Sequence, residues 1–321
     1  MSRRSGYNTD RMEAVGTRIY IRLLPAMFAA FALARAQVAI EPRPKPPERI
    51  TRPNLRVDSN LVLVPVSVVD QRNHPVTGLE RENFRVFDDG VGRTITAFAM
   101  EDEPVAIGLI FDHSGSVFGI QRNESETTRM FLGTCNPEDE YFLVVFSGRP
   151  ELAAPLTRGP EEVQYRILTT KWGGLTALYD GVILGLNELK KSTLSRKALL
   201  VVSDGGENHS RYNHGELANA IEESDALIYT IGFASDQANF PLLKWMAELS
   251  GGRAIAGQAE DLPDVAAKVA LELRNLYVLG FSAAGIQRDG KVHNLRVQLI
   301  TPHGMAPLKA SWRRSYRAPN D

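Results

Sequence analysis

The sequence predicts an α/β protein with a doubly wound, mostly parallel six-stranded sheet and a small accessory β domain formed by both flanks of the chain. The first observation is that short apolar runs alternate with amphipathic stretches between residues 102 and 276. Such alternation is typical of strands joined by right-handed helical crossovers. The second is that residues 55–101 and 277–317 contain short segments rich in β-branched residues. The accessory strands are therefore expected from both sides of the α/β region.

The composition is that of a globular protein. With 321 residues, 43% hydrophobic and 23% charged, the chain can hold one large or two modest domains. A net charge of −1 gives no electrostatic footprint for nucleic acid or for an anionic membrane, so we expect neither as a partner. Cys135 is the single cysteine, which excludes an intramolecular disulfide and a Cys-rich zinc site. We predict that it is a small buried apolar residue rather than a reactive thiol.

The N-terminus predicts export. Residues 1–22 contain five arginines, and the charge-free run Leu23–Ala34 is followed by the small-x-small pattern Ala34-Arg35-Ala36. This order is typical of a secretory signal, here residues 1–36. We expect a periplasmic or extracellular protein with no stable membrane span after cleavage; an uncleaved anchor is the alternative. Residues 37–54 are rich in proline and predict an extended linker.

The segment 55–101 predicts an N-terminal β unit. Asn60–Val69 is rich in β-branched residues, and Pro65 favours an edge position because it lacks a backbone N–H. Phe84–Phe87 and Arg93–Met100 are strand candidates, and Asp88-Asp89-Gly90 between them is a hairpin signal.

The region 102–276 predicts alternating strands and helices. The apolar run Val105–Phe111 suits a strand buried on both faces of a parallel sheet. Further strands are expected at Tyr141–Phe146, Glu151–Thr157 (an edge), Arg196–Ser203, Ala226–Phe233 and Gly252–Ala256. Helices are expected at about 117–133, Glu161–Thr170, Thr176–Lys191, His214–Ser224, Phe240–Ser250 and Asp261–Leu276. The lysines that end the third of these helices suit its dipole.

The C-terminal region 277–317 returns to β signals. Strands are expected at Tyr277–Ala283, Val292–Ile300 and Leu308–Arg314. Since these segments and residues 55–101 flank the same α/β region, we expect them to pack together.

Polar oxygen donors follow the strand ends of the predicted sheet. Carboxylate and hydroxyl groups come directly after Val105–Phe111, where open α/β sheets place their ligand sites. A double glycine, Gly173-Gly174, precedes a threonine, and a second aspartate follows Arg196–Ser203. If the two strands are neighbours, the set that converges is Asp112, Ser114, Ser116, Thr176 and Asp204. Such oxygens suit a hard cation such as Mg²⁺; singly, Ser116 and Thr176 could instead be helix N-caps.

These motifs resemble the von Willebrand factor type A (VWA) domain. DHSGS is similar to its D-x-S-x-S motif, Thr176 to its distant threonine, and SDGGEN to its second aspartate loop. Residues 55–317 resemble the bacterial "VWFA-related" proteins through a VPV strand, an ENF-x-V-x-DDG segment and a YVLGF…DGK…RV stretch. Arg313-Arg314-Ser315-Tyr316 departs from the Arg-x-Gly-Tyr of that family.

The resemblance implies a strand order of 3-2-1-4-5-6 and a metal ion-dependent adhesion site. In such sites the hydroxyls bind Mg²⁺ or Mn²⁺ directly, while one or both aspartates act partly through water. His113, Gly174 and Gly205 would lie at the rim of the ligand position.

The chemistry favours binding over catalysis. Two aspartates only balance the charge of the cation and neutral hydroxyls fill further positions, so the metal stays electrophilic toward an incoming carboxylate. We therefore predict a non-enzymatic protein whose partner presents an exposed Asp or Glu. The alternatives are a structural module for envelope assembly with an unused metal site, and a secreted hydrolase. The sequence has no Gly-x-Ser-x-Gly, His-Glu-x-x-His or Walker motif. Ser114 or Ser116 beside His113 would be a poor nucleophile–base pair.

Some residues near the motifs have other interpretations. The His113 side chain is expected to point away from the metal toward solvent. His209, His214 and Glu207 could be imagined as a zinc site, although no further ligand at useful spacing supports it. Trp172 could shape the binding rim or cap the core.

Overall fold

A computed structural model describes residues 61–100, 102–117, 119–233, 238–284 and 290–318. All of them belong to one compact unit, Leu55–Asp321. The predicted signal peptide, residues 1–36, and the predicted linker, residues 37–54, lie outside the described residues. Within the described residues, no helix has both the length and the apolar character needed to span a membrane.

The α/β region is built on a six-stranded sheet in the order β10-β9-β8-β5-β6-β7. Its strands are β5 (Val105–Asp112), β6 (Glu140–Phe146), β7 (Pro150–Thr157), β8 (Arg196–Ser203), β9 (Leu227–Phe233) and β10 (Ala254–Gly257). Only the edge strand β7 runs antiparallel to its neighbour. Counted from β5, this is the predicted order 3-2-1-4-5-6, so the predicted fold class is confirmed.

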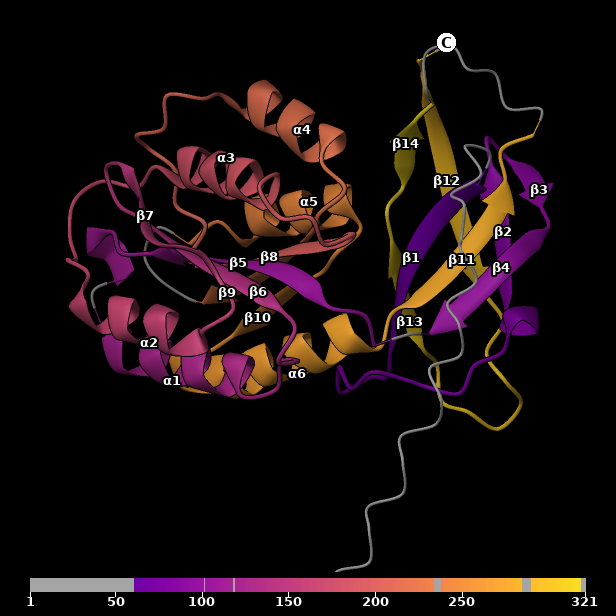
Figure 1. The fold of residues 1–321 in the computed structure, drawn as a ribbon, viewed down its shortest axis with the longest axis horizontal. Coiled ribbons are helices and arrows are strands. Elements are labelled where there is room, and N and C mark those ends of the chain that lie inside the picture. Colours follow the sequence, from indigo (N-terminus) through magenta and orange to yellow (C-terminus); the bar gives the residue numbers. More distant parts are fainter. Residues whose placement is uncertain (1–60, 101, 118, 234–237, 285–289, 319–321) are drawn as a thin grey trace, which may run out of the picture. The chain divides into compact units, whose positions relative to one another are not determined.

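Helices cover both faces of this sheet. They are α1 (Gln121–Leu132), α2 (Pro160–Thr169), α3 (Leu178–Leu189), α4 (His214–Glu223), α5 (Phe240–Ser250) and α6 (Leu262–Arg274). Figure 1 shows α1, α2 and α6 on one face and α3, α4 and α5 on the other. Each face has its own hydrophobic core, and every residue of the central strand β5 is buried between the two.

Both helices next to the site begin later than the sequence predicts. The chain from Gly115 to Val117 forms a short 3-10 turn before α1 starts at Gln121. The helix predicted from Thr176 starts at Leu178. The Thr176 carbonyl accepts hydrogen bonds from the backbone N–H groups of Asn208 and His209, at 3.0 Å each. Thr176 therefore belongs to a loop whose backbone is bonded to another loop.

The flanks form two four-stranded sheets, in the orders β13-β1-β11-β4 and β14-β12-β2-β3. The strands are β1 (Leu61–Val69), β2 (Phe84–Asp88), β3 (Val91–Arg93), β4 (Ile95–Met100), β11 (Tyr277–Ser282), β12 (Val292–Leu299), β13 (Lys309–Trp312) and β14 (Ser315–Arg317). Apolar side chains from both sheets share one core. The predicted accessory β domain is thus confirmed as a sandwich made from both flanks.

The predicted edge position of Pro65 is wrong. Strand β1 lies between β11 and β13. Strand β13, however, pairs only with Val66–Val69, and Pro65 lies just beyond that stretch. The missing N–H of Pro65 therefore does not interrupt the pairing of β13 with β1.

The hairpin predicted at Asp88-Asp89-Gly90 is present, because Asp88 pairs with Val91 across the turn. Asp89 and Gly90 have φ values of 45° and 81°. Positive φ at both central residues is the conformation of the tight turn that matches strand twist. The single strand predicted from Arg93 to Met100 is instead two strands, β3 and β4, because they belong to different sheets.

Candidate functional site

The ends of β5 and β8 bring the two predicted aspartates together. The strands pair in parallel with Phe111 opposite Val202, so Asp112 emerges beside the Ser203-Asp204 pair. Ser203 Oγ donates a hydrogen bond of 2.6 Å to Asp112 Oδ2, and the Gly205 N–H donates one of 2.9 Å to Ser203 Oγ. Both aspartates are buried. The carboxyl edge of the sheet thus fixes their positions through backbone and side-chain contacts.

The two serines of the D-x-S-x-S turn fold back toward Asp112. The Ser114 N–H donates to Asp112 Oδ1 at 2.9 Å, and the hydroxyl oxygens of Ser114 and Ser116 lie 3.2 Å apart. The turn therefore presents two hydroxyls next to one carboxylate.

The threonine loop is bonded to the same turn. Gly173 and Gly174 have φ values of 115° and 104°, which only glycine adopts readily. The Gly173 N–H donates to the His113 carbonyl at 2.7 Å, and the Gly115 N–H donates to the Gly174 carbonyl at 3.0 Å. The Thr176 N–H donates to Asn208 Oδ1 at 2.9 Å. Hydrogen bonds thus join the three loops that carry all five predicted residues.

The electrostatics of the site favour a bound cation. Burial raises the pKa of Asp112 to about 6, and the negative charge of Asp204 adds to this rise. Hydrogen bonds from Ser114 and Ser203 offset only part of it. Among the described residues, no Lys or Arg side chain forms an ion pair with Asp112. A divalent cation would relieve the cost of the buried charge, and the all-oxygen donor set fits Mg²⁺ or Mn²⁺.

The prediction that His113 points to solvent is wrong. Only 1% of the residue is exposed, and its Nε2 lies 2.9 and 3.0 Å from the two carboxylate oxygens of Glu124. Its ring stacks on Trp172 with centroids 3.9 Å apart and an angle of 12°. Trp172 is partly buried and also packs against the core, so its ring caps the core. Of the three predicted rim residues, only Gly174 is exposed, because Gly205 is buried as well.

Three contributors to the site were missed by sequence reasoning. Ser203 holds Asp112 and Asn208 holds Thr176. Both could have been found from the sequence, since Ser203 ends β8 directly before Asp204 and Asn208 lies on the loop that follows. Glu124 had no such signal. It lies eleven positions after His113, and only the packing of α1 against the site turn brings the two side chains together.

The residues considered as possible zinc ligands make other contacts. His214 stacks on Trp245 with ring centroids 3.9 Å apart. The Glu207 carboxylate accepts backbone hydrogen bonds from Tyr179 at 3.0 Å and from His209 at 3.0 Å.

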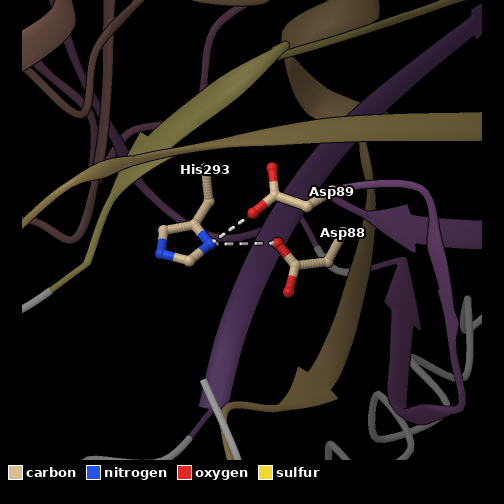
Figure 2. A group of neighbouring side chains, drawn as sticks. All are labelled: Asp88, Asp89 and His293. Atoms are coloured by element: carbon tan, nitrogen blue, oxygen red, sulfur yellow. Dashed lines mark ion pairs between the residues drawn. The ribbon is translucent and has the colours of Figure 1, made fainter. Parts of the chain in front are cut away.

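A second group of potential metal ligands lies in the β sandwich. Figure 2 shows His293 pointing its Nδ1 toward Asp89 Oδ2 at 2.8 Å and Asp88 Oδ1 at 3.8 Å. Within the described residues this is the group of three His, Cys, Asp or Glu side chains that could hold a metal. Arg93 already pairs with Asp88 at 2.8 Å, and the Tyr316 hydroxyl donates to it at 3.2 Å. We interpret the group as an ion-pair network that joins β2, β12 and β14.

The strand order, the D-x-S-x-S turn after the central strand, and the Thr and Asp on adjoining loops define a VWA-like domain. No protein-family model matches the sequence, and no curated protein matches it either.

Solved structures of similar fold include a von Willebrand factor type A protein from Catenulispora acidiphila, with 12% identity and a TM-score of 0.49 over 74% of this chain and 72% of that one. BatB from Bacteroides thetaiotaomicron has 12% identity and a TM-score of 0.45 over 53% of this chain and 100% of that one. The vWF domain of the type V pili tip protein Mfa5 from Porphyromonas gingivalis has 15% identity and a TM-score of 0.43 over 58% and 97%. Similarity at these identities concerns the fold alone.

Proposed function

We propose that this protein is a non-enzymatic binding protein that grips a carboxylate of a partner protein through Mg²⁺ or Mn²⁺. The metal would be held by Asp112, Ser114, Ser116, Thr176 and Asp204. The observation that carries the proposal is the meeting of two buried carboxylates with three hydroxyl-bearing residues on loops that are hydrogen-bonded to one another. We further propose export on the basis of residues 1–36, which lie outside the described residues.

The protein's own residues would orient the donors before the metal binds. Ser203 and the Ser114 backbone hold the Asp112 carboxylate from two sides, and the Gly206 N–H donates to Asp204 Oδ1 at 2.8 Å. Once bound, the metal would act as a Lewis acid for an incoming carboxylate, since two aspartates do no more than balance its charge. Mg²⁺ keeps octahedral coordination, which leaves a position for an exchangeable ligand.

Hydrolysis is disfavoured by the geometry around His113. Both ring nitrogens of His113 already have hydrogen-bond partners: Nε2 contacts the Glu124 carboxylate, and Nδ1 lies 3.3 Å from the Lys171 carbonyl oxygen. The imidazole is therefore not placed to take a proton from Ser114 or Ser116.

Calorimetric titration of the full chain with Mn²⁺ and Mg²⁺ tests the proposal. We expect saturable binding that is lost in Asp112→Asn, a nearly isosteric change. The matched control is Asp89→Asn, which removes a carboxylate from the second cluster and should leave binding intact. Binding that survives Asp112→Asn and disappears in Asp89→Asn would contradict the proposal, because it would place the metal in the β sandwich. An absence of binding by the unaltered chain would favour a structural module instead.

A further inference from the structure

The loops around Thr176 form one surface, which we call the rim and define as residues 147–149, 171–175 and 207–212. The Ala177 N–H donates to the Ser147 carbonyl at 2.8 Å, and the His209 N–H donates to the Thr176 carbonyl at 3.0 Å. A Cβ placed on Gly148 would lie 3.7 Å from His209 Cδ2 and 4.0 Å from Leu175 Cβ. The three segments therefore lie next to one another around Thr176, one of the candidate metal ligands.

Apolar side chains stand exposed on the rim. Leu175 is 50% exposed and directly precedes the buried Thr176, while Tyr212 is 40% exposed on the third segment. A single exposed leucine is ordinary in a soluble protein. Leu175, however, adjoins a proposed metal ligand, so a partner whose carboxylate reaches the metal would bring its neighbouring side chains onto Leu175.

The exposed charges on the rim are all positive. Its exposed charged side chains are those of Arg149, Lys171 and Arg211. In the described part of the chain, Arg149 and Lys171 form no ion pair, and Arg211 pairs with the buried Asp180 at 3.1 Å while staying exposed. Glu207, the acid of the third segment, is only partly exposed, and its carboxylate accepts hydrogen bonds from Tyr179, His209 and Ser210.

We propose that the rim docks an acidic protein segment in which an apolar residue adjoins the carboxylate that reaches the metal. Leu175 would contact the apolar residue, and Arg149 and Lys171 would attract the flanking acids. This inference rests on the proposed function and adds the class of partner. Complementary charge across an interface speeds association and makes it sensitive to salt. Burial of apolar surface against Leu175 would supply selectivity.

Fluorescence anisotropy with labelled peptides tests the inference, using the full chain loaded with Mn²⁺. The probes are GDDELDDG, GDDESDDG and GSSELSSG. We expect GDDELDDG to bind about fivefold more tightly than GDDESDDG, from partial burial of one leucine. Leu175→Ser should abolish this preference. The matched control, Leu168→Ser, changes a leucine that is 69% exposed on α2 and should retain it.

The charge arm uses the double variant Arg149→Gln/Lys171→Gln. It should bind GDDELDDG more weakly than the unaltered protein does. Its affinity should also fall about half as steeply with salt between 50 and 300 mM NaCl. The control Lys190→Gln/Lys309→Gln removes two exposed lysines away from the rim and should change neither property.

Calorimetry with Mn²⁺ alone separates the two proposals. If the unaltered chain binds no Mn²⁺, the proposed function fails. If it binds Mn²⁺, and the rim variants do too, the inference is overturned by equal affinity for the three peptides, by no detectable peptide binding up to millimolar concentrations, or by equal effects of Leu168→Ser and Leu175→Ser.

Discussion

Replacing Asp112 with asparagine should stabilise the metal-free protein while abolishing metal binding. The side chain is fully buried, and burial raises its pKa from 3.8 to about 6. A rise of this size corresponds to about 3 kcal/mol of cost for the ionised form. Asparagine keeps an acceptor for the Ser114 N–H but loses the charge. Its amide NH₂ would donate to Ser203 Oγ, which already accepts a hydrogen bond from the Gly205 N–H. We therefore expect a net gain of about 1–3 kcal/mol in the free energy of unfolding at pH 8.

The pH dependence gives the sign of this effect. Below pH 3.8 the Asp112 carboxyl is protonated in both the folded and unfolded protein, so its burial carries no charge penalty. Between pH 3.8 and about 6 the folded state retains a proton that the unfolded state has lost. The contribution of this group to stability thus falls as pH rises and reaches its full penalty above about pH 6. The advantage of Asp112→Asn should appear over that window and vanish at pH 3.5.

Urea unfolding at pH 8, with EDTA and with Mn²⁺, measures both effects. At a hundredfold excess over its Kd, Mn²⁺ should stabilise the unaltered protein by about 2.7 kcal/mol and leave Asp112→Asn unchanged. Adding the metal should therefore remove or reverse the difference in stability between Asp112→Asn and the unaltered protein. A variant that is less stable than the unaltered protein in EDTA at pH 8, or that gains stability from Mn²⁺, would refute the reasoning.

Three further variants probe the surroundings of the site. Ser203→Ala removes the hydroxyl that holds Asp112 and should weaken Mn²⁺ binding by about tenfold or more, as calorimetry would show; unchanged affinity would count against a positioning role. Gly205→Ala puts a Cβ 2.5 Å from the Asn239 carbonyl at a φ of 81° and should cost about 2 kcal/mol or more in urea unfolding. His113→Ala leaves Glu124 buried without its partner and should cost about 3 kcal/mol at pH 8. The loss should be smaller at pH 5, because burial raises the pKa of Glu124 to about 7 and the carboxyl is then neutral; an equal loss at both pH values would contradict this account.

The strand order could be predicted only through the resemblance to the VWA domain, whereas the convergence of the site loops depends on local patterns and on one geometric rule. An apolar run that ends in Asp112 and another that ends before Asp204 predict the convergence if the two strands are neighbours, since the carboxyl ends of parallel strands share an edge of the sheet. The double glycine before Thr176 likewise indicates a close backbone approach, which the structure shows between Gly174 and Gly115.

The environment of His113 could not be predicted, because it depends on tertiary packing. A histidine inside a polar turn is expected to be exposed. It is the packing of α1 against this turn that brings Glu124 to the Nε2 of His113. The division of the predicted strand Arg93–Met100 has a similar cause. Its first residue, Arg93, ends β3, whereas Ile95–Met100 form β4 in the other sheet of the sandwich, and periodicity carries no information about which sheet a residue joins.

The six-stranded region is inserted between two neighbouring strands of the sandwich. The chain leaves β4 after Met100 and re-enters at Tyr277 of β11, and these two residues are paired across the sheet. The entry and exit of the whole region are thus held about 5 Å apart by this pair, which is the last of several between β4 and β11. A mechanical pull applied between β1 and β14 would be borne by the sandwich, and the six-stranded region would carry no tension while β4 and β11 remain paired. A pull applied to the six-stranded region would instead be shared between this pairing and side-chain contacts that join the two parts, such as the hydrogen bond from Ser67 Oγ to Glu272.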